Sequence, residues 1–187
     1  MHIIWERAPS FNCFFKTSFS VLFSPKDFFV NIQEGGVPLA LLYGVIANTT
    51  GGLLGLIWLA LLQRQVLERA LFPSQFLFSY SLLLPLLSVL GILISSLLFH
   101  LFLLLLRGAN RSFKITLKAL SYGQASQLMN AIPLFGPFLA TLYGLIIYVI
   151  ALKEVHRTSY PRASLSVFIP FFSSLLLFFA GLYRFAF

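Results

Sequence analysis

Long apolar stretches dominate the chain and constrain its fold more than any other feature. Three of them, at residues 37–62, 74–106 and 163–187, reach the about 20 residues that an α-helix needs to cross a bilayer. Hydrophobic residues make up 59% of the chain, charged residues only 10%, and the mean hydropathy is +0.92, values that soluble globular domains do not reach. We therefore expect an all-α, polytopic integral membrane protein.

The segment at residues 118–156 predicts a hairpin of two helical arms. Pro133, Gly136 and Pro137 lie at its centre, where the prolines remove backbone donors and the glycine permits a tight turn. The second arm, residues 138–152, is almost entirely hydrocarbon. The first arm has about 16 residues, fewer than an untilted crossing needs, so the sequence leaves open whether it crosses or dips in and returns. Counting both arms gives five transmembrane helices.

Polar side chains inside these apolar segments are the candidate functional residues. Several recur at spacings of three on the first arm and can share a face. They could line a path for a polar solute or lipid headgroup, or hydrogen-bond to neighbouring helices, which is the favoured interpretation. The candidates are Asn48, Ser95, His100, Ser121, Tyr122, Gln124, Gln127 and Asn130.

Catalytic and metal-binding patterns are missing from the sequence. It has no H-E-x-x-H, no G-x-S-x-G and no pair of intramembrane carboxylates, and the single Cys13 excludes an intramolecular disulfide. Four neighbours after the hairpin suggest an interfacial charge cluster rather than acid–base chemistry. They are Lys153, Glu154, His156 and Arg157. We expect no enzyme, no metal and no cofactor.

The first 36 residues predict a cytoplasmic or interfacial segment ahead of a membrane domain at residues 37–187. One short helix has an apolar face, with Asn12, Lys16 and Ser20 on the other side. The apolar face comprises Phe11, Phe14, Phe15, Phe19, Leu22 and Phe23. A second helix should start at Pro25, with Ser24 as its N-cap, and end at Gly35 and Gly36.

The basic residues predict the orientation. With five spans, ten of the 13 Lys and Arg residues fall on one side and three on the other, so the N-terminus should be cytoplasmic and the C-terminus outside. The net charge of +8 lies in short clusters between apolar segments. That distribution suits anionic headgroups of the cytoplasmic leaflet rather than nucleic acid.

Motifs spread along almost the whole chain resemble the Yip family, named for interaction with Ypt/Rab GTPases, and specifically its short prokaryotic members. They are Ile4-Trp5-Glu6-Arg7, Thr17 with Ser24-Pro25-Lys26-Asp27-Phe28-Phe29, Pro38-Leu39 with Tyr43, Phe113 with Thr116-Leu117 and Tyr122, Ile132-Pro133 with Gly136, and Ala151-Leu152-Lys153-Glu154-Val155-His156 followed by Arg162-Ala163. Ile4 and Ala151 depart from the proline and glycine usual in the family. The resemblance implies five spans, a cytoplasmic N-terminus and, without the long extension of eukaryotic members, a bacterial inner-membrane setting.

Two functions remain open at this point. The first is a non-enzymatic membrane organiser or scaffold, whose Phe-rich N-terminal helices and same-side cations hold the bilayer's inner leaflet. The second is a small transporter, channel or lipid-moving protein that uses the polar arm from Ser121 to Asn130. The sequence also leaves open whether the chain binds a second copy of itself or another membrane protein.

Overall fold

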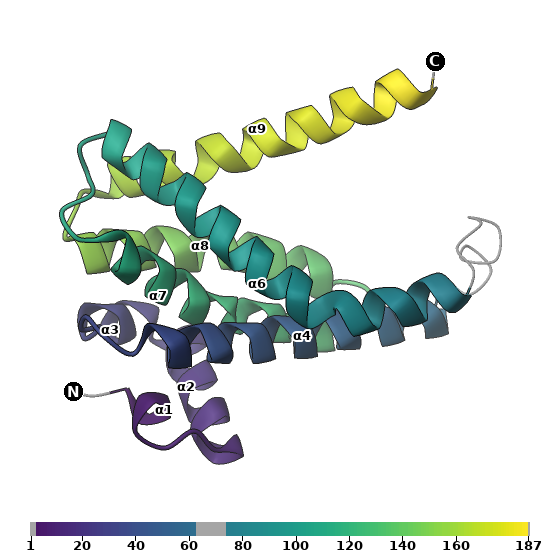
Figure 1. The fold of residues 1–187 in the computed structure, drawn as a ribbon, viewed down its shortest axis with the longest axis horizontal. Helices are drawn as coiled ribbons and strands as arrows, with labels where there is room; N and C mark the ends of the chain where they lie inside the picture. The colour runs from purple at the N-terminus through teal and green to yellow at the C-terminus, as the bar shows by residue number, and fades with distance from the viewer. Residues whose placement is uncertain (1–2, 63–73, 187) are drawn as a thin grey trace.

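The computed structural model describes residues 3–62 and 74–186, which form helices joined by short connections (Figure 1). The elements are α1 (Ile4–Arg7), α2 (Phe11–Phe23), α3 (Pro25–Val30), α4 (Val37–Leu62), α6 (Ser74–Leu105), α7 (Phe113–Gly123), the 3₁₀ helix η1 (Gln124–Ala131), α8 (Gly136–His156) and α9 (Tyr160–Ala186). Within the described ranges, four segments are long and apolar enough to cross a membrane: Val37–Leu62, Phe78–Leu105, Gly136–His156 and Tyr160–Gly181. The all-α fold is confirmed, and these helices are consistent with a multi-pass membrane protein.

The long helices begin and end close to the predicted residues, but α3 is shorter than expected. It ends at Val30 rather than at Gly35 and Gly36. The Asn31 amide Nδ2 donates to the Asp27 carbonyl and so satisfies one of the last backbone acceptors of the helix. Both glycines instead adopt left-handed backbone in the linker to α4, with φ of 100° and 66°.

The polar first arm, made of α7 and η1, packs between α4 and α8 in the interior of the bundle. In Figure 1, α4, α6 and α8 run along the long axis, and the second half of α9 leaves the bundle. The arm begins at Phe113, earlier than the expected Lys118, and changes from α to 3₁₀ geometry at Gln124. Because a 3₁₀ helix rises more per residue, the arm covers roughly 32 Å, close to the ~30 Å of a hydrocarbon core.

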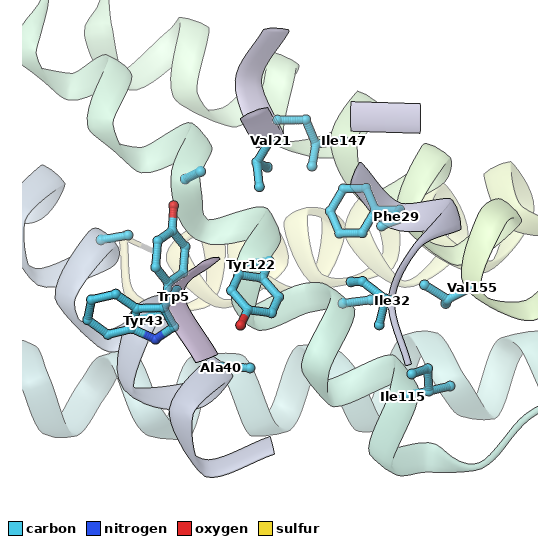
Figure 2. Close-up of a cluster of buried hydrophobic side chains, with 14 of the residues drawn as sticks. Trp5, Val21, Phe29, Ile32, Ala40, Tyr43, Ile115, Tyr122, Ile147 and Val155 are labelled. Carbon is cyan, nitrogen blue, oxygen red and sulfur yellow. The ribbon is translucent and has the colours of Figure 1, made fainter. Parts of the chain in front are cut away.

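Residues from the N-terminal segment share a core with the bundle (Figure 2). Trp5 of α1 lies edge-on to Tyr43 of α4, with ring centroids 5.8 Å apart. Its indole Nε1 donates to the Leu39 carbonyl at 2.7 Å. From α2 and α3, the buried Val21 and Phe29 join the same cluster as Ile147 of α8. The first three helices are therefore docked onto the bundle by buried apolar surface.

Helix α2 lies across the bundle in Figure 1, and one of its faces packs against the bundle. The buried residues are Phe14, Thr17, Ser18 and Val21. Ser18 fits this face because its hydroxyl bonds both the Phe14 carbonyl and the Tyr43 hydroxyl. Four phenylalanines of the predicted apolar face point away from the bundle in one row: Phe11, Phe15, Phe19 and Phe23. We call these four residues the Phe row.

Candidate functional site

Gln124, where α7 passes into η1, is the centre of a chain of side-chain hydrogen bonds that joins the polar arm to α4 and α8. Asn48 Nδ2 of α4 donates to Gln124 Oε1 at 3.0 Å, and Gln124 Nε2 donates to the Tyr148 hydroxyl of α8 at 2.9 Å. Gln124 is 5% exposed, so its amide is paired inside the bundle on both of its polar atoms. Ser95, proposed as another partner, bonds only to carbonyls of its own helix, and Ser121 likewise bonds the Leu117 carbonyl.

Glycines bring the arm into backbone contact with its neighbours. A Cβ added to Gly51 would lie 2.1 Å from the Gln127 carbonyl oxygen, and one added to Gly44 would lie 2.7 Å from the Ser121 carbonyl oxygen. From the other side, Gly144 of α8 approaches the Ser126 hydroxyl. The small residues of α4 therefore serve helix packing within the chain, as small-residue patterns in membrane helices commonly do.

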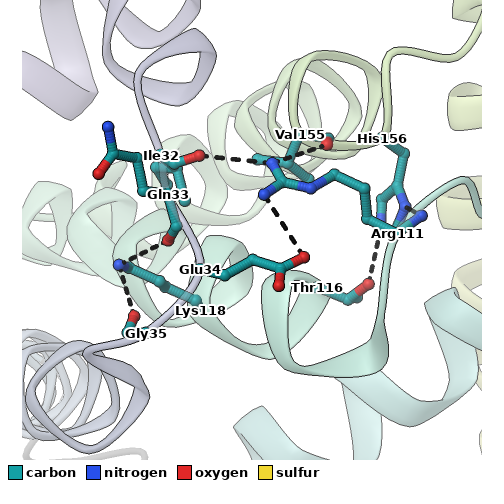
Figure 3. A network of polar contacts seen from close by, with 9 residues as sticks. All are labelled: Ile32, Gln33, Glu34, Gly35, Arg111, Thr116, Lys118, Val155 and His156. Carbon is teal, nitrogen blue, oxygen red and sulfur yellow. Dashed lines mark hydrogen bonds and ion pairs between the residues drawn. The ribbon is translucent and has the colours of Figure 1, made fainter.

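A buried ion pair joins α1 to α7, and the sequence interpretation missed it. The Lys118 ammonium lies 2.8 Å from Glu6 Oε1 and donates to Glu6 Oε2 at 3.0 Å. It also donates to the carbonyls of Gln33 and Gly35, both in the linker before α4 (Figure 3). Tyr122 donates its hydroxyl to Glu6 Oε1 at 2.8 Å. Lys118 is 2% exposed, so this group is a buried latch, which we call the Glu6–Lys118 latch, and not a loop cation as expected.

Two histidines bracket Thr116 at the same end of the bundle. His156 Nδ1 accepts from the Arg111 backbone N–H, which places the His156 proton on Nε2. That nitrogen donates to the Thr116 hydroxyl at 2.8 Å, and the same hydroxyl forms a hydrogen bond with His100 Nδ1 at 2.8 Å. These bonds tie α6, α7 and α8 together.

The predicted charge cluster is divided in two by this arrangement. Lys153 pairs with Glu154 at 2.6 Å, and Arg157 is exposed in left-handed backbone that ends α8. His156, by contrast, has no exposed surface and belongs to the histidine–threonine chain. Arg111 forms an ion pair with Glu34 at 3.5 Å, and its guanidinium also donates to the carbonyls of Ile32 and Val155 (Figure 3).

The break between the arms uses a different residue from the one expected. Leu134, not glycine, adopts the left-handed backbone there, with φ of 64°. Gly136 opens α8, and a Cβ on it would lie 2.8 Å from both the Met129 carbonyl oxygen and the Asn130 Cα. Position 136 therefore requires glycine, because the backbone of η1 lies against it. Pro133 precedes the turn, and Pro137 sits in the first turn of α8.

Comparison with known proteins places this geometry in a family. The Yip1 domain model matches residues 19–182, the bulk of the chain. The chain belongs to the Yip1 domain family. No curated protein and no solved structure matches it.

The Yip1 domain match covers the polar arm, both histidines and Lys118, but begins inside α2. Glu6, the partner of Lys118, lies before the matched residues. In the part of the chain that the structure describes, no group of three or more His, Cys, Asp or Glu side chains could hold a metal ion. In this Yip1 domain, the hydrogen bonds of Gln124 and Thr116 join neighbouring helices.

Proposed function

We propose that the chain is a non-enzymatic organiser of the bacterial inner membrane, in which the docked N-terminal helices embed in the cytoplasmic leaflet. The observation that carries the proposal is the Phe row on α2. Phe19 is 58% exposed and Phe23 76% exposed, while the opposite face of the same helix is sealed against the bundle. A rigidly held helix that presents aromatic side chains outward is suited to lie in the membrane interface.

The cations support the cytoplasmic placement. Ten of them belong to the N-terminal segment, the α6–α7 connection with α7, and the region around the end of α8: Arg7, Lys16, Lys26, Arg107, Arg111, Lys114, Lys118, Lys153, Arg157 and Arg162. Lys and Arg gather on the cytoplasmic side of membrane proteins. Those that are exposed would meet anionic headgroups beside the Phe row, each adding about 1 kcal/mol of attraction near the surface.

Chain continuity supports a fifth crossing through the polar arm. Asn110 and Arg111, just before α7, both bond His156 at the end of α8. The arm therefore starts at the end of the bundle where α8 finishes, and it must reach the opposite end for α8 to begin there. If α8 crosses the bilayer, so does the arm, shielded by α4 and α8. Five crossings would put the two termini on opposite sides, and the cations favour the N-terminus as the cytoplasmic one.

The competing function, transport along the polar arm, is disfavoured by the pairing of the amides. Gln124 is bonded on both sides, and Asn130 Nδ2 donates to Gln127 Oε1 at 3.2 Å. A solute moving along this face would have to displace bonds that hold α4, η1 and α8 together.

Reconstitution into vesicles containing phosphatidylglycerol tests the proposal. We expect the wild-type chain to reduce vesicle diameter in electron micrographs as the protein-to-lipid ratio rises. The double substitution Phe19→Ser and Phe23→Ser should weaken this effect. Phe172→Ser, at a spanning-helix position that is also 58% exposed, is the matched control and should not. Unchanged diameters with wild type would refute the proposal, and solute flux or lipid flip abolished by Gln124→Leu would establish transport instead.

A further inference from the structure

An open cavity lies among the three N-terminal helices α1, α2 and α3. Its volume is 320 Å³, within the range of about 300–1,000 Å³ that small-molecule sites occupy. Ile4 and Phe28 contribute to its apolar wall. Its polar wall includes Thr17, Ser20, Ser24 and Asp27.

Two serines of the lining place this cavity beside the Phe row. Ser20 and Ser24 are exposed, and they directly follow Phe19 and Phe23 in the sequence. Successive residues of an α-helix are about 100° apart, so the serines flank the row. The inference below rests on the proposed embedding of α2 in the cytoplasmic leaflet, which brings the cavity to the level of the lipid headgroups.

The Asp27 carboxylate supplies an unpaired negative charge to the cavity. The other three acidic side chains that the structure describes each form an ion pair with a Lys or Arg. Within that part of the chain Asp27 forms none, and the Asn31 amide bonds its backbone carbonyl rather than its side chain. No Lys or Arg is among the described residues that line the cavity. A cation with N–H donors would therefore be bound here by a charge-assisted hydrogen bond.

Thr17 adds a second group without a partner to the same walls. Its side chain is 3% exposed, and among the described residues its Oγ1 forms no hydrogen bond. Burying a hydroxyl without a partner costs free energy. A ligand with more than one N–H donor is therefore favoured, because one donor can bond the Asp27 carboxylate and another the Thr17 hydroxyl.

We propose that this cavity binds the ammonium headgroup of phosphatidylethanolamine from the leaflet in which α2 lies. A primary ammonium carries three N–H donors, and Ile4 and Phe28 offer apolar surface to the rest of the lipid. The anionic headgroup of phosphatidylglycerol would instead meet the Asp27 charge without a cation in the lining to offset it. The quaternary ammonium of phosphatidylcholine has no N–H donor. These differences select the ethanolamine headgroup.

Photo-crosslinking of the full chain in phosphatidylcholine nanodiscs tests the site. The probe is a phosphatidylethanolamine with a photoactivatable group in one acyl chain, close to the glycerol. We expect crosslinks in the peptide at residues 17–31. Unlabelled phosphatidylethanolamine should compete with the probe, and phosphatidylglycerol with the same tails should not.

Substitution of Asp27 tests the charged partner. Asp27→Asn should raise the amount of probe needed for half-maximal crosslinking about tenfold, the effect of losing one hydrogen bond to a charged group. Glu34→Gln is the matched control, because it removes an exposed carboxylate of the nearby α3–α4 linker that does not line the cavity. Crosslinking in this variant should remain at the wild-type level.

Filling the cavity makes the test independent of Asp27. Ser20→Leu should reduce the crosslinks, whereas Ser173→Leu, the same change at an exposed position of α9, should leave them unchanged. Equal competition by phosphatidylglycerol, or undiminished crosslinking in the Asp27→Asn chain, would overturn the proposal. Soluble glycerophosphoethanolamine that competes as strongly as the lipid would place the ligand in water and overturn the lipid assignment.

The leaflet role and the headgroup site fail in different measurements. In vesicles of phosphatidylglycerol and phosphatidylcholine the site has no ligand, so Asp27→Asn should change vesicle diameter as the wild type does. Wild-type chain without effect on these vesicles refutes the leaflet role. Headgroup competition that does not depend on Asp27, in a chain that still changes vesicle diameter, refutes the site alone.

Discussion

Removing the carboxylate of the Glu6–Lys118 latch should release the N-terminal helices from the bundle. In the Glu6→Gln variant, the Lys118 ammonium keeps the carbonyls of Gln33 and Gly35 but loses the charge of its partner Glu6. With 2% of its side chain exposed, Lys118 cannot recover that loss by hydration while α1 stays docked. Undocking is then the route by which the ammonium regains solvent.

The size of the effect follows from the burial of the two partners. Breaking a fully buried ion pair by removing one member costs about 3–5 kcal/mol. The Glu6 side chain is 21% exposed, and two carbonyl acceptors remain, so we expect about 2–3 kcal/mol here. That difference raises the undocked population about 30- to 160-fold.

A buried thiol on α2 reports undocking. Val21 has no exposed surface and faces the bundle, so Val21→Cys in a Cys13→Ser background reacts with a maleimide only when α2 opens. The labelling rate in detergent micelles then follows the open population. The matched control is Arg7→Gln, the neighbouring residue on the same helix, which is exposed and should label at the parent rate.

A second substitution separates the ion pair from general damage. Lys118→Met combined with Glu6→Gln leaves no charge buried, so the double variant should label more slowly than Glu6→Gln alone. Equal labelling of Glu6→Gln and the parent would refute the reasoning, as would a double variant that opens more readily than the single one.

The remaining predictions concern contacts inside the bundle, measured by thermal unfolding followed by tryptophan fluorescence. Gly51→Val should destabilise the chain by about 3 kcal/mol because its side chain would overlap the Gln127 backbone, whereas Gly91→Val, in open space, should not. Gln124→Leu removes hydrogen bonds to α4 and α8 and should lower the stability by about 1–2 kcal/mol. An unchanged stability would mean that Asn48 and Tyr148 form hydrogen bonds with other groups in the variant. Thr116→Val separates the two histidines and should cost a similar amount, about 1–2 kcal/mol, and an unchanged midpoint would show that their chain of bonds adds no stability.

The sequence predicted what depends on local composition. The bounds of α4 follow from an apolar run that starts at Val37 and ends at Leu62, and the break near Pro133 follows from residues that cannot continue a helix. The 3₁₀ geometry of η1 could not be foreseen. It depends on how closely Gly51 and Gly144 press the arm from both sides, and this is a property of the packed bundle.

The latch escaped prediction because its two charges are far apart in the chain. Lys118 follows three other cations of the α6–α7 region in the sequence, and nothing local distinguishes a lysine whose partner lies 112 positions away. One signal was available. The chain has only five acidic residues, and Glu6, the first of them, stands directly beside Trp5. The docking of the opposite face of α2 escaped prediction for a similar reason, since it depends on the hydroxyl pair between Ser18 and the distant Tyr43.

The same separation orders the events of biosynthesis. When Glu6 and Trp5 are translated, Lys118 and Tyr122 have not been made, and α4 and α6 must be translated before α7. The nascent N-terminal helices therefore lack these partners at first. Closure of α1 onto α7 has to wait until the start of the polar arm has been synthesised.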